Sequence, residues 1–264
     1  IHDVGRIGDY HYIAMEYLKK CHRPSFQFHP DYCRMMHEVA GFFPPTTEAL
    51  ARFASESLEI VKNIDILGVV GRRGDEELIR KYNPSLTPVE IQCLGDHIPF
   101  LENPWTCCLK GRKVLVIHPF AETIRKQYPK RLLLFNGREV LPEFELLTFP
   151  AILSNGDAAA TLSCPDWFAA LKMMCQQIEQ IEFDTALIGA GAYGMFLGDF
   201  CKRIGKQAIH MGGATQLLFG IKGVRWEHQY PPEFSARLFN EHWVRPSQNE
   251  TPPGVRKVED ACYW

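Results

Sequence analysis

The sequence predicts an α/β fold of the Rossmann-like kind, with a mostly parallel sheet flanked by helices. Three observations predict it. Segments with helical periodicity alternate with short apolar runs along the whole chain, several of these runs are rich in β-branched residues, and glycine turns follow two of them. The chain has 264 residues, of which 46% are hydrophobic, so it can bury a full core, and disorder is excluded.

The first third of the chain contains local signals for five elements. We expect a short strand at residues 3–7 and then a helix at 10–20, whose apolar residues share one face. Thr46 or Thr47 can cap a second helix through its hydroxyl group. Residues 64–70 form an apolar, β-branched run typical of a strand covered on both faces. The segment 75–82 is acidic at its start and basic at its end, which favours a helix through its dipole.

The middle of the chain contains two more predicted strands. Residues 113–118 are apolar and β-branched, and Pro119 ends this strand because it has no N–H to donate to the sheet. A helix follows from about residue 122 and is interrupted at Pro129. Residues 143–153 supply another strand.

The last third repeats the alternation. Residues 163–166 (Ser-Cys-Pro-Asp) cap a helix with one apolar face, and its Met and Trp residues are interpreted as core. A strand at 185–188, a helix at 192–204 and a strand at 206–210 follow. From Pro231 onward, the prolines at turns predict irregular structure that wraps the surface.

Charge and hydropathy exclude several classes of protein. Lys and Arg number 29 against 31 Asp and Glu, and no long basic block occurs, so we expect no nucleic-acid partner. No apolar run approaches the roughly 18 to 20 residues that span a bilayer, so we expect a soluble, cytoplasmic protein. We interpret residues 1–245 as one α/β domain and 246–264 as an irregular tail. Because the first residue is Ile1, the sequence is compatible with a domain cut from a longer chain.

The nine cysteines indicate reduced thiols, since they form no CxxC pair and no dense framework. Five Cys and His residues close together in the sequence raise the alternative of a zinc site. They are Cys21, His22, His29, Cys33 and His37. Their spacing matches no zinc template, polar pairs four residues apart also arise by chance on helices, and Cys33 can equally be a small core residue.

Two glycine-rich turns follow predicted strands. Small residues at Gly189, Gly191 and Gly194 would let the backbone approach a phosphate at the start of a helix. A dinucleotide site would also require an acidic residue about 20 positions later, where the sequence has His210. That absence argues against a nicotinamide dehydrogenase and against a methyltransferase that holds its methyl donor through an acid. The alternative is that these glycines only permit close packing of helix on strand.

The second glycine turn begins at His210 and includes Gly212, Gly213 and, in the helix behind it, Gln216. Lys222 and Arg225 follow closely, so backbone donors and cations together suggest a phosphate-binding environment. In the alternative, both cations are solvated surface charges and His210 is a buried imidazole with satisfied hydrogen bonds.

Two further turns carry titratable groups. His118 ends a predicted strand and Glu122 begins the next helix, so either could act as a base, although Glu122 is also a favourable first-turn charge. Asp9 and His11 flank one residue at a predicted strand-to-helix turn, and an oxygen and a nitrogen ligand spaced in this way can share a divalent cation.

These motifs together resemble glycosyltransferases of the GT-D fold and, more closely, uncharacterised proteins encoded in polysaccharide-biosynthesis clusters. The segments that carry the resemblance are Arg6-x-Gly8, Gly41-Phe-Phe-Pro44, Asp65-Ile-Leu-Gly68, Asn103-Pro-Trp105, 113–124, Leu141-Pro-Glu-Phe-Glu145, 186–194 and 210–226. The resemblance implies transfer of a sugar from a nucleotide-diphosphate donor, with UDP favoured, to a saccharide acceptor.

The resemblance also implies site residues. Asp9 matches the Asp of an Asp-x-Glu motif that binds a metal and the donor diphosphate, whereas His11 stands in place of the Glu. The metal could therefore be Mn²⁺ rather than Mg²⁺, or Arg6, Lys222 and Arg225 could neutralise the diphosphate without one. The full expected binding set is Arg6, Gly8, Thr123, Gly189, Gly191, Tyr193, Gly194, His210, Gly212, Gly213, Gln216, Lys222 and Arg225.

Catalysis is expected from His118, Glu122 and Asp9, with either of the first two activating the acceptor hydroxyl. Tyr193 or Trp226 could stack on the base or sugar, or pack in the core. Two other functions stay open from the sequence. One is a Rossmann-type enzyme that uses NAD or S-adenosylmethionine, and the other is a non-catalytic module that binds a nucleotide or a saccharide.

Overall fold

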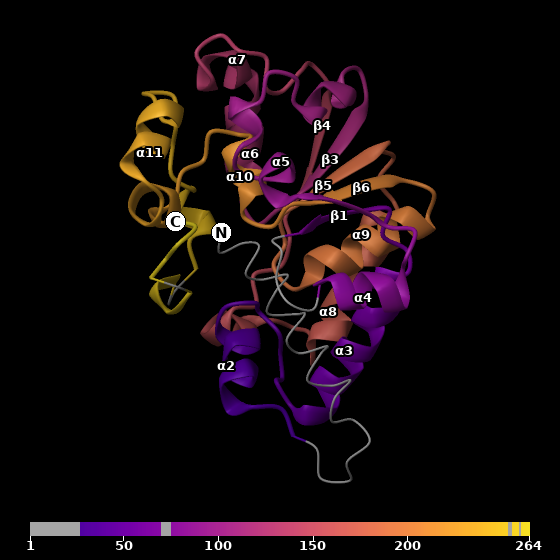
Figure 1. Cartoon of the computed structure of the whole chain (residues 1–264). Helices are drawn as coiled ribbons and strands as arrows, with labels where there is room; N and C mark the ends of the chain where they lie inside the picture. Colours follow the sequence, from indigo (N-terminus) through magenta and orange to yellow (C-terminus); the bar gives the residue numbers. More distant parts are fainter. Residues whose placement is uncertain (1–26, 70–74, 253–254, 259) are drawn as a thin grey trace.

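A computed structural model describes residues 27–69, 75–252, 255–258 and 260–264 (Figure 1). The strand expected at 3–7 and the helix expected at 10–20 lie outside these residues. The predicted fold class is confirmed, since parallel strands in two sheets are flanked by helices in a Rossmann-like arrangement. Within the described residues, none of the helices combines the length and the apolar character needed to cross a bilayer.

The main sheet has four parallel strands in the order β4-β3-β5-β6. They are β3 (Lys113–Ile117), β4 (Glu145–Phe149), β5 (Thr185–Ile188) and β6 (Gln207–His210). The chain passes from β3 outward to β4 and then returns beside β3 as β5, so the order of connections reverses between β3 and β5. In open α/β sheets, ligands bind at the carboxyl ends of the strands at such a switch point.

Helices cover both faces of this sheet, as the apolar runs of β3 and β5 predict. Leu115, Ile117 and Ile188 pack into a cluster with the helices α3 (Thr47–Val61), α8 (Trp167–Ile178) and α9 (Tyr193–Arg203). Val114, Val116 and Leu187 point to the other face, against α6 (Ala121–Gln127), α7 (Arg131–Leu134) and α10 (Ala214–Leu217). Figure 1 shows these two groups of helices on opposite sides of the strands.

A second, two-stranded parallel sheet precedes the main one. It pairs β1 (Ile66–Val69) with β2 (Thr87–Glu90), and α4 (Asp75–Tyr82) connects them. The short helix α5 (Ile91–Leu94) follows β2 directly and packs against β1. The remaining elements are α2 (Pro30–Glu38), η1 (Ile98–Phe100), η2 (Trp105–Leu109), η3 (Tyr128–Lys130), η4 (Gly156–Thr161), η5 (Arg225–Gln229, π-helical), α11 (Pro232–Leu238), η6 (Gln248–Glu250) and η7 (Val255–Lys257).

The carboxyl-terminal part differs from the expectation in two respects. A helix, α11, begins at Pro232, where a proline in the first turn fits the helix without losing a hydrogen bond. The last residues do not stay on the surface, because Cys262, Tyr263 and Trp264 are buried in the cluster that covers Val114 and Val116. The tail therefore forms part of the core of the domain.

Candidate functional site

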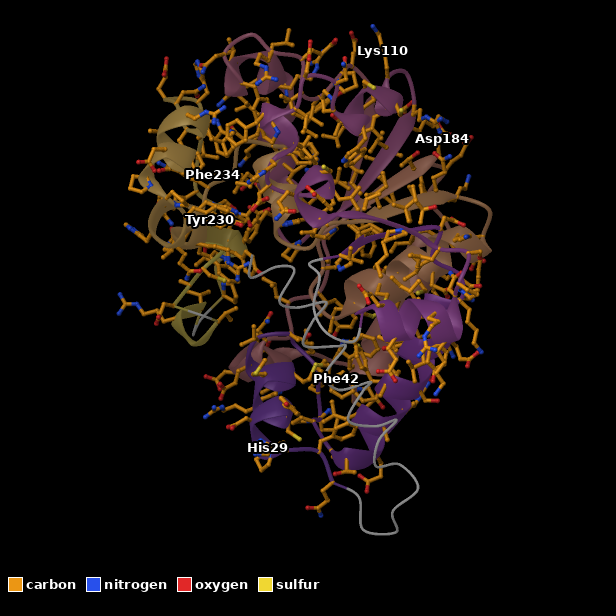
Figure 2. The ribbon with its side chains drawn as sticks, viewed as in Figure 1. His29, Phe42, Lys110, Asp184, Tyr230 and Phe234 are labelled. Atoms are coloured by element: carbon orange, nitrogen blue, oxygen red, sulfur yellow. The ribbon has the colours of Figure 1, made fainter. Side chains whose placement is uncertain are left out.

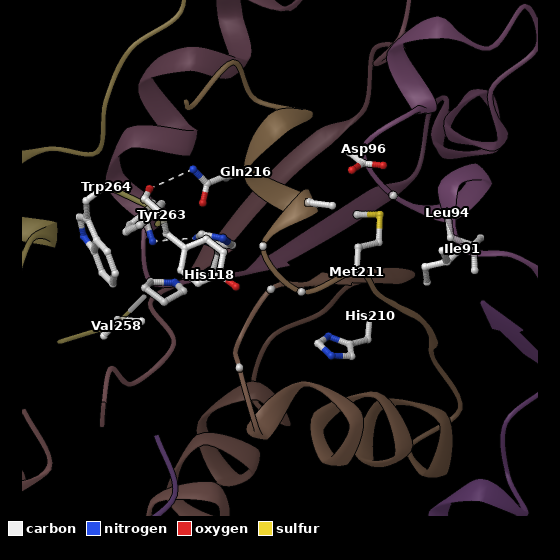
Figure 3. A pocket seen from close by; sticks show the side chains of 18 of the residues that line it. Ile91, Leu94, Asp96, His118, His210, Met211, Gln216, Val258, Tyr263 and Trp264 are labelled. Carbon is white, nitrogen blue, oxygen red and sulfur yellow. Dashed lines mark hydrogen bonds between the residues drawn. The ribbon is translucent and has the colours of Figure 1, made fainter. Parts of the chain in front are cut away.

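A cavity of about 350 Å³ lies at the carboxyl ends of β3, β5 and β6 (Figure 3). This is the switch-point end of the sheet, whereas Lys110 and Asp184 mark the opposite end, where the strands begin (Figure 2). The floor of the cavity is made by the residues that follow the three strands. They are His118, Pro119 and Phe120 after β3, Gly189 and Gly191 after β5, and His210, Met211, Gly212 and Gly213 around the end of β6.

The walls come from distant parts of the chain. Figure 3 shows Ile91, Leu94 and Asp96 on one side of the cavity and Tyr263 and Trp264 on the other. The two sides are thus supplied by α5 with its following turn and by the end of the tail. The cavity is enclosed largely by apolar and aromatic side chains with a few polar groups, as is typical of small-molecule sites.

Gly189 is the position at which the three turns meet. A Cβ atom there would lie 2.5 Å from Cδ2 of His118 and 2.6 Å from the carbonyl oxygen of Gly212. Only glycine allows this approach, so the sequence signal at 189 reflects close packing of the turns around the cavity. Gly191 and Gly212 have φ angles of 51° and 58°, in the left-handed region that glycine adopts without strain.

Open backbone donors gather in these two turns. Gly191, Gly212, Gly213 and Ala214 all line the cavity. In the described part of the chain, no protein acceptor takes a hydrogen bond from the N–H group of any of them. Successive N–H groups in turns of alternating handedness form concavities that bind anions. The geometry is therefore suited to a phosphate or diphosphate group.

His118 is a neutral imidazole. It is buried, and burial lowers its pKa to about 3. Its Nδ1 atom accepts a hydrogen bond from the N–H of Phe120 at 3.0 Å, which assigns the ring proton to Nε2. His118 is thus a poor base near neutral pH, and its chemistry is that of a neutral donor.

His210 lines the cavity, and the end of the neighbouring strand β5 holds its ring in place. Its Nδ1 donates a hydrogen bond to the carbonyl oxygen of Ile188 at 3.1 Å. The ring packs on Gly194, where a Cβ atom would lie 2.0 Å from Cε1. Gly194 therefore permits helix-on-strand packing, and it is not among the residues that line the cavity.

Tyr193 lies in the core beneath the turn. Its ring stacks on Trp167, with centroids 4.8 Å apart and planes at 5°. Its hydroxyl group is 2.9 Å from that of Ser154, and burial raises its pKa. Trp226 is also buried in the core. Neither aromatic side chain lines the cavity, so neither is placed to stack on a bound ligand.

Glu122 and Thr123 lie at the start of α6, away from the cavity lining. Glu122 pairs with Lys126 at 2.5 Å, and the hydroxyl of Thr123 donates to Glu250. Such contacts stabilise a helix terminus rather than activate a substrate.

The two expected cations also lie outside the lining residues. Lys222 pairs with Glu227 at 3.4 Å. Arg225 is fully buried and donates to the hydroxyl of Tyr263 at 3.1 Å and to Sγ of Cys262. Arg225 therefore anchors the tail that forms one wall. Gln216 does line the cavity, and its side-chain amide donates a hydrogen bond to the carbonyl oxygen of Tyr263 at 3.1 Å.

Arg6, Gly8, Asp9 and His11 lie outside the described residues, so the expected metal pair is not placed. Cys21 and His22 of the alternative zinc cluster lie there too. The ring of His29 caps α2, and His37 donates to the carbonyl oxygen of Phe42. In the part of the chain that the structure describes, no three His, Cys, Asp or Glu side chains gather to hold a metal ion.

Several residues of the cavity walls were not predicted from the sequence. Asp96 follows a helix of only four residues, which is too short to show periodicity. Tyr230 lies just before the part of the chain expected to be irregular, which begins at Pro231, and it belongs to no motif. Tyr263 and Trp264 are terminal aromatic residues, and their hydrophobicity was the one signal that could have indicated burial.

Comparisons with known proteins add no relative. The chain matches no protein-family model, no curated protein and no solved structure.

Proposed function

We propose that the protein is a glycosyltransferase that moves a sugar from a nucleotide-diphosphate donor to a saccharide acceptor. The observation that carries the proposal is the group of open N–H donors on Gly191, Gly212, Gly213 and Ala214, in a cavity at the switch point of a parallel sheet. The resemblance of residues 186–194 and 210–226 to uncharacterised proteins encoded in polysaccharide-biosynthesis clusters supports the same function, while the resemblance to GT-D enzymes rests chiefly on the turn that contains Asp9 and His11.

The chemistry of sugar transfer requires such donors. As the bond between the anomeric carbon and the diphosphate breaks, negative charge grows on the departing nucleoside diphosphate. Preorganised N–H groups in a site shielded from water stabilise that charge without reorganisation. His118 adds a neutral Nε2–H donor at the same floor, and we assign it to binding rather than to proton abstraction, since burial lowers its pKa to about 3.

Positive charge for the diphosphate has to come from elsewhere, because the described lining residues include no Lys or Arg. We propose that Arg6 supplies it, together with a divalent cation, Mn²⁺ or Mg²⁺, held by Asp9 and His11. The described lining residues contribute only one carboxylate, Asp96, which is too few oxygen ligands for a complete metal site. The cation, when bound, would act as a Lewis acid on the diphosphate oxygens.

A pair of variants at Gly213 tests the role of the N–H donors. Gly213 has a φ angle of −64°, which proline adopts, so Gly213→Pro removes one N–H group and keeps the backbone angle. Gly213→Ala carries the same Cβ atom and keeps the N–H group. A hydrogen bond to a charged group contributes about 1.5–3 kcal/mol, so we expect Gly213→Pro to bind UDP about tenfold to hundredfold more weakly than Gly213→Ala.

Isothermal titration of both variants with UDP, GDP and dTDP measures this difference. Equal affinities of the two variants for the nucleoside diphosphates would contradict a role of the Gly213 N–H group in binding. Tight binding of NAD or S-adenosylmethionine by the wild type, without binding of any nucleoside diphosphate, would select the Rossmann-type alternative.

A further inference from the structure

The cavity wall made by α5 and its following turn carries one carboxylate, that of Asp96, together with the polar side chains of Gln92 and His97. Asp96 is the single Asp or Glu among the described lining residues. The hydroxyl of Tyr230 donates to its Oδ2 atom. Among the described residues, no group donates a hydrogen bond to Oδ1. One oxygen of the carboxylate is therefore held in place, and the other is available to a ligand.

Asp96 lies next to the open N–H donors. A Cβ atom on Gly95, the preceding residue, would be 3.7 Å from Cβ of Ala214. The carboxylate makes no hydrogen bond to the N–H groups of the glycine turn. A diphosphate bound to those N–H groups would consequently have its attached group against the Asp96 wall. In a nucleotide sugar, the group on that side of the diphosphate is either the sugar or the ribose.

The surroundings of Asp96 favour the sugar. Ile91, Leu94 and Met211 give this part of the cavity an apolar surface (Figure 3). A pyranose presents C–H groups to such a surface and hydroxyl groups to a carboxylate, which can accept two or more hydrogen bonds. A carboxylate among aliphatic groups therefore matches the two kinds of surface that a neutral sugar offers.

The wall is also preorganised. The ring of Tyr230 packs on Phe234 with centroids 4.7 Å apart (Figure 2). Phe234 in turn packs on Phe100, with centroids 5.5 Å apart. Phe100 lies shortly after Asp96 in the chain. The packed rings therefore hold together the two segments that carry Tyr230 and Asp96, the partners of this hydrogen bond. A group held in this way loses little conformational freedom when it binds a ligand.

We propose that Asp96 accepts hydrogen bonds from hydroxyl groups of the donor sugar and selects neutral sugars over acidic ones. The inference rests on the proposed function and names the substrate class of the same site. A sugar with a carboxylate at this wall would place two like charges side by side in a partly desolvated cavity, and discrimination by such repulsion is strong. Tyr230 is the positioning residue for Asp96.

Isothermal titration of wild type and Asp96→Asn with UDP-glucose, UDP and UDP-glucuronate tests the proposal. For the wild type we expect UDP-glucose to bind more tightly than UDP and UDP-glucuronate to bind more weakly than UDP-glucose. For Asp96→Asn we expect about a tenfold to hundredfold loss of affinity for UDP-glucose, unchanged affinity for UDP, and a smaller ratio between UDP-glucose and UDP-glucuronate. If the protein binds guanosine nucleotides more tightly than uridine nucleotides, GDP-mannose takes the place of UDP-glucose in the titrations and GDP takes the place of UDP. The expected differences in affinity are then the same.

Two further variants complete the design. Glu90→Gln makes the same change of carboxylate to amide at the start of α5, on an exposed side chain outside the cavity lining, and we expect wild-type affinities. Tyr230→Phe removes the hydroxyl that holds Oδ2, and we expect a severalfold loss for UDP-glucose and none for UDP. This variant also reports on the wall should Asp96→Asn fail to fold.

The outcomes separate the two proposals. Equal affinities of wild type and Asp96→Asn for UDP-glucose, or equal affinities of the wild type for UDP-glucose and UDP, would overturn the role of Asp96 and leave nucleotide binding intact. A wild type that binds no nucleotide sugar of any kind would overturn the proposed function itself.

Discussion

The imidazole of His118 is buried and bonds a backbone N–H group, and its burial makes folding sensitive to acid. Burial lowers its pKa from 6.5 to about 3. Between these values the unfolded chain takes up a proton at His118 that the folded protein does not. The free energy of unfolding therefore falls as the pH falls, by at most about 1.4 kcal/mol per pH unit from this group.

The variant His118→Asn should flatten this dependence. The amide oxygen of Asn can accept the N–H of Phe120 in place of Nδ1, and Asn does not titrate. We expect the loss of stability between about pH 7 and pH 5 to be smaller in the variant by about 2 kcal/mol, measured by urea unfolding at each pH. Parallel losses in the two proteins would show that His118 is not the group responsible.

A second prediction for a single residue concerns the replacement of Gly189 by alanine. Because a Cβ atom there would meet His118 and Gly212 at 2.5 and 2.6 Å, Gly189→Ala should destabilise the protein by about 1–3 kcal/mol. Gly198→Ala is the matched control, since its nearest neighbour, Ile188 Cδ1, is 4.0 Å away within α9. Helix propensity makes this control neutral or stabilising by up to about 1 kcal/mol. Equal effects in urea unfolding would contradict the close packing at Gly189.

At the scale of elements, the tail is tied to α6 by Glu250. Its Oε1 atom accepts hydrogen bonds from the N–H groups of Glu122 at 2.8 Å and Thr123 at 3.2 Å. These are among the first N–H groups of the helix, which have no partner within it. Its Oε2 atom accepts from the backbone N–H of Ser247 at 3.3 Å, as part of a capping box in η6, and also from the hydroxyl of Ser247 at 2.8 Å.

Replacement of Glu250 should consequently loosen both elements. In Glu250→Gln one oxygen becomes a donor and the negative charge at the start of α6 is lost. We expect the free energy of unfolding to fall by about 1–2 kcal/mol in urea titration. Glu139→Gln, on an exposed side chain, should leave it within about 0.5 kcal/mol of wild type. A loss as small in Glu250→Gln as in this control would mean that the tail is not coupled to α6.

Local sequence signals predicted the long or strongly patterned elements. The strand at 185–188 and the helix at 75–82 have the bounds that the sequence indicated. Thr46 or Thr47 was expected to cap a second helix, and the side chain of Thr46 caps α3. By contrast, α5 has only four residues, too few for a helical period, and Pro88 in β2 argues against a strand.

The same limit applies to the site at the scale of the whole molecule. Gly189, Gly191, Gly212 and Gly213 were found because glycines after strands have a local cause in the backbone. Asp96, Tyr263 and Trp264 join them only through long-range packing, which no short motif encodes. Glu122 has the carboxylate expected of a base and Lys222 the cation expected at a phosphate, yet both lie outside the cavity lining and form ion pairs with nearby residues.

The proposed function requires that the cavity binds a nucleotide sugar, and the ligand-dependent stability of the wild type tests this most directly. Thermal unfolding would be measured with UDP-, GDP-, dTDP- and CMP-sugars, each with and without Mn²⁺, and with NAD and S-adenosylmethionine. A nucleotide-diphosphate sugar at 100 times its dissociation constant should stabilise the folded protein by about 2.7 kcal/mol. Stabilisation by NAD or S-adenosylmethionine and by none of the nucleotide sugars would contradict the account.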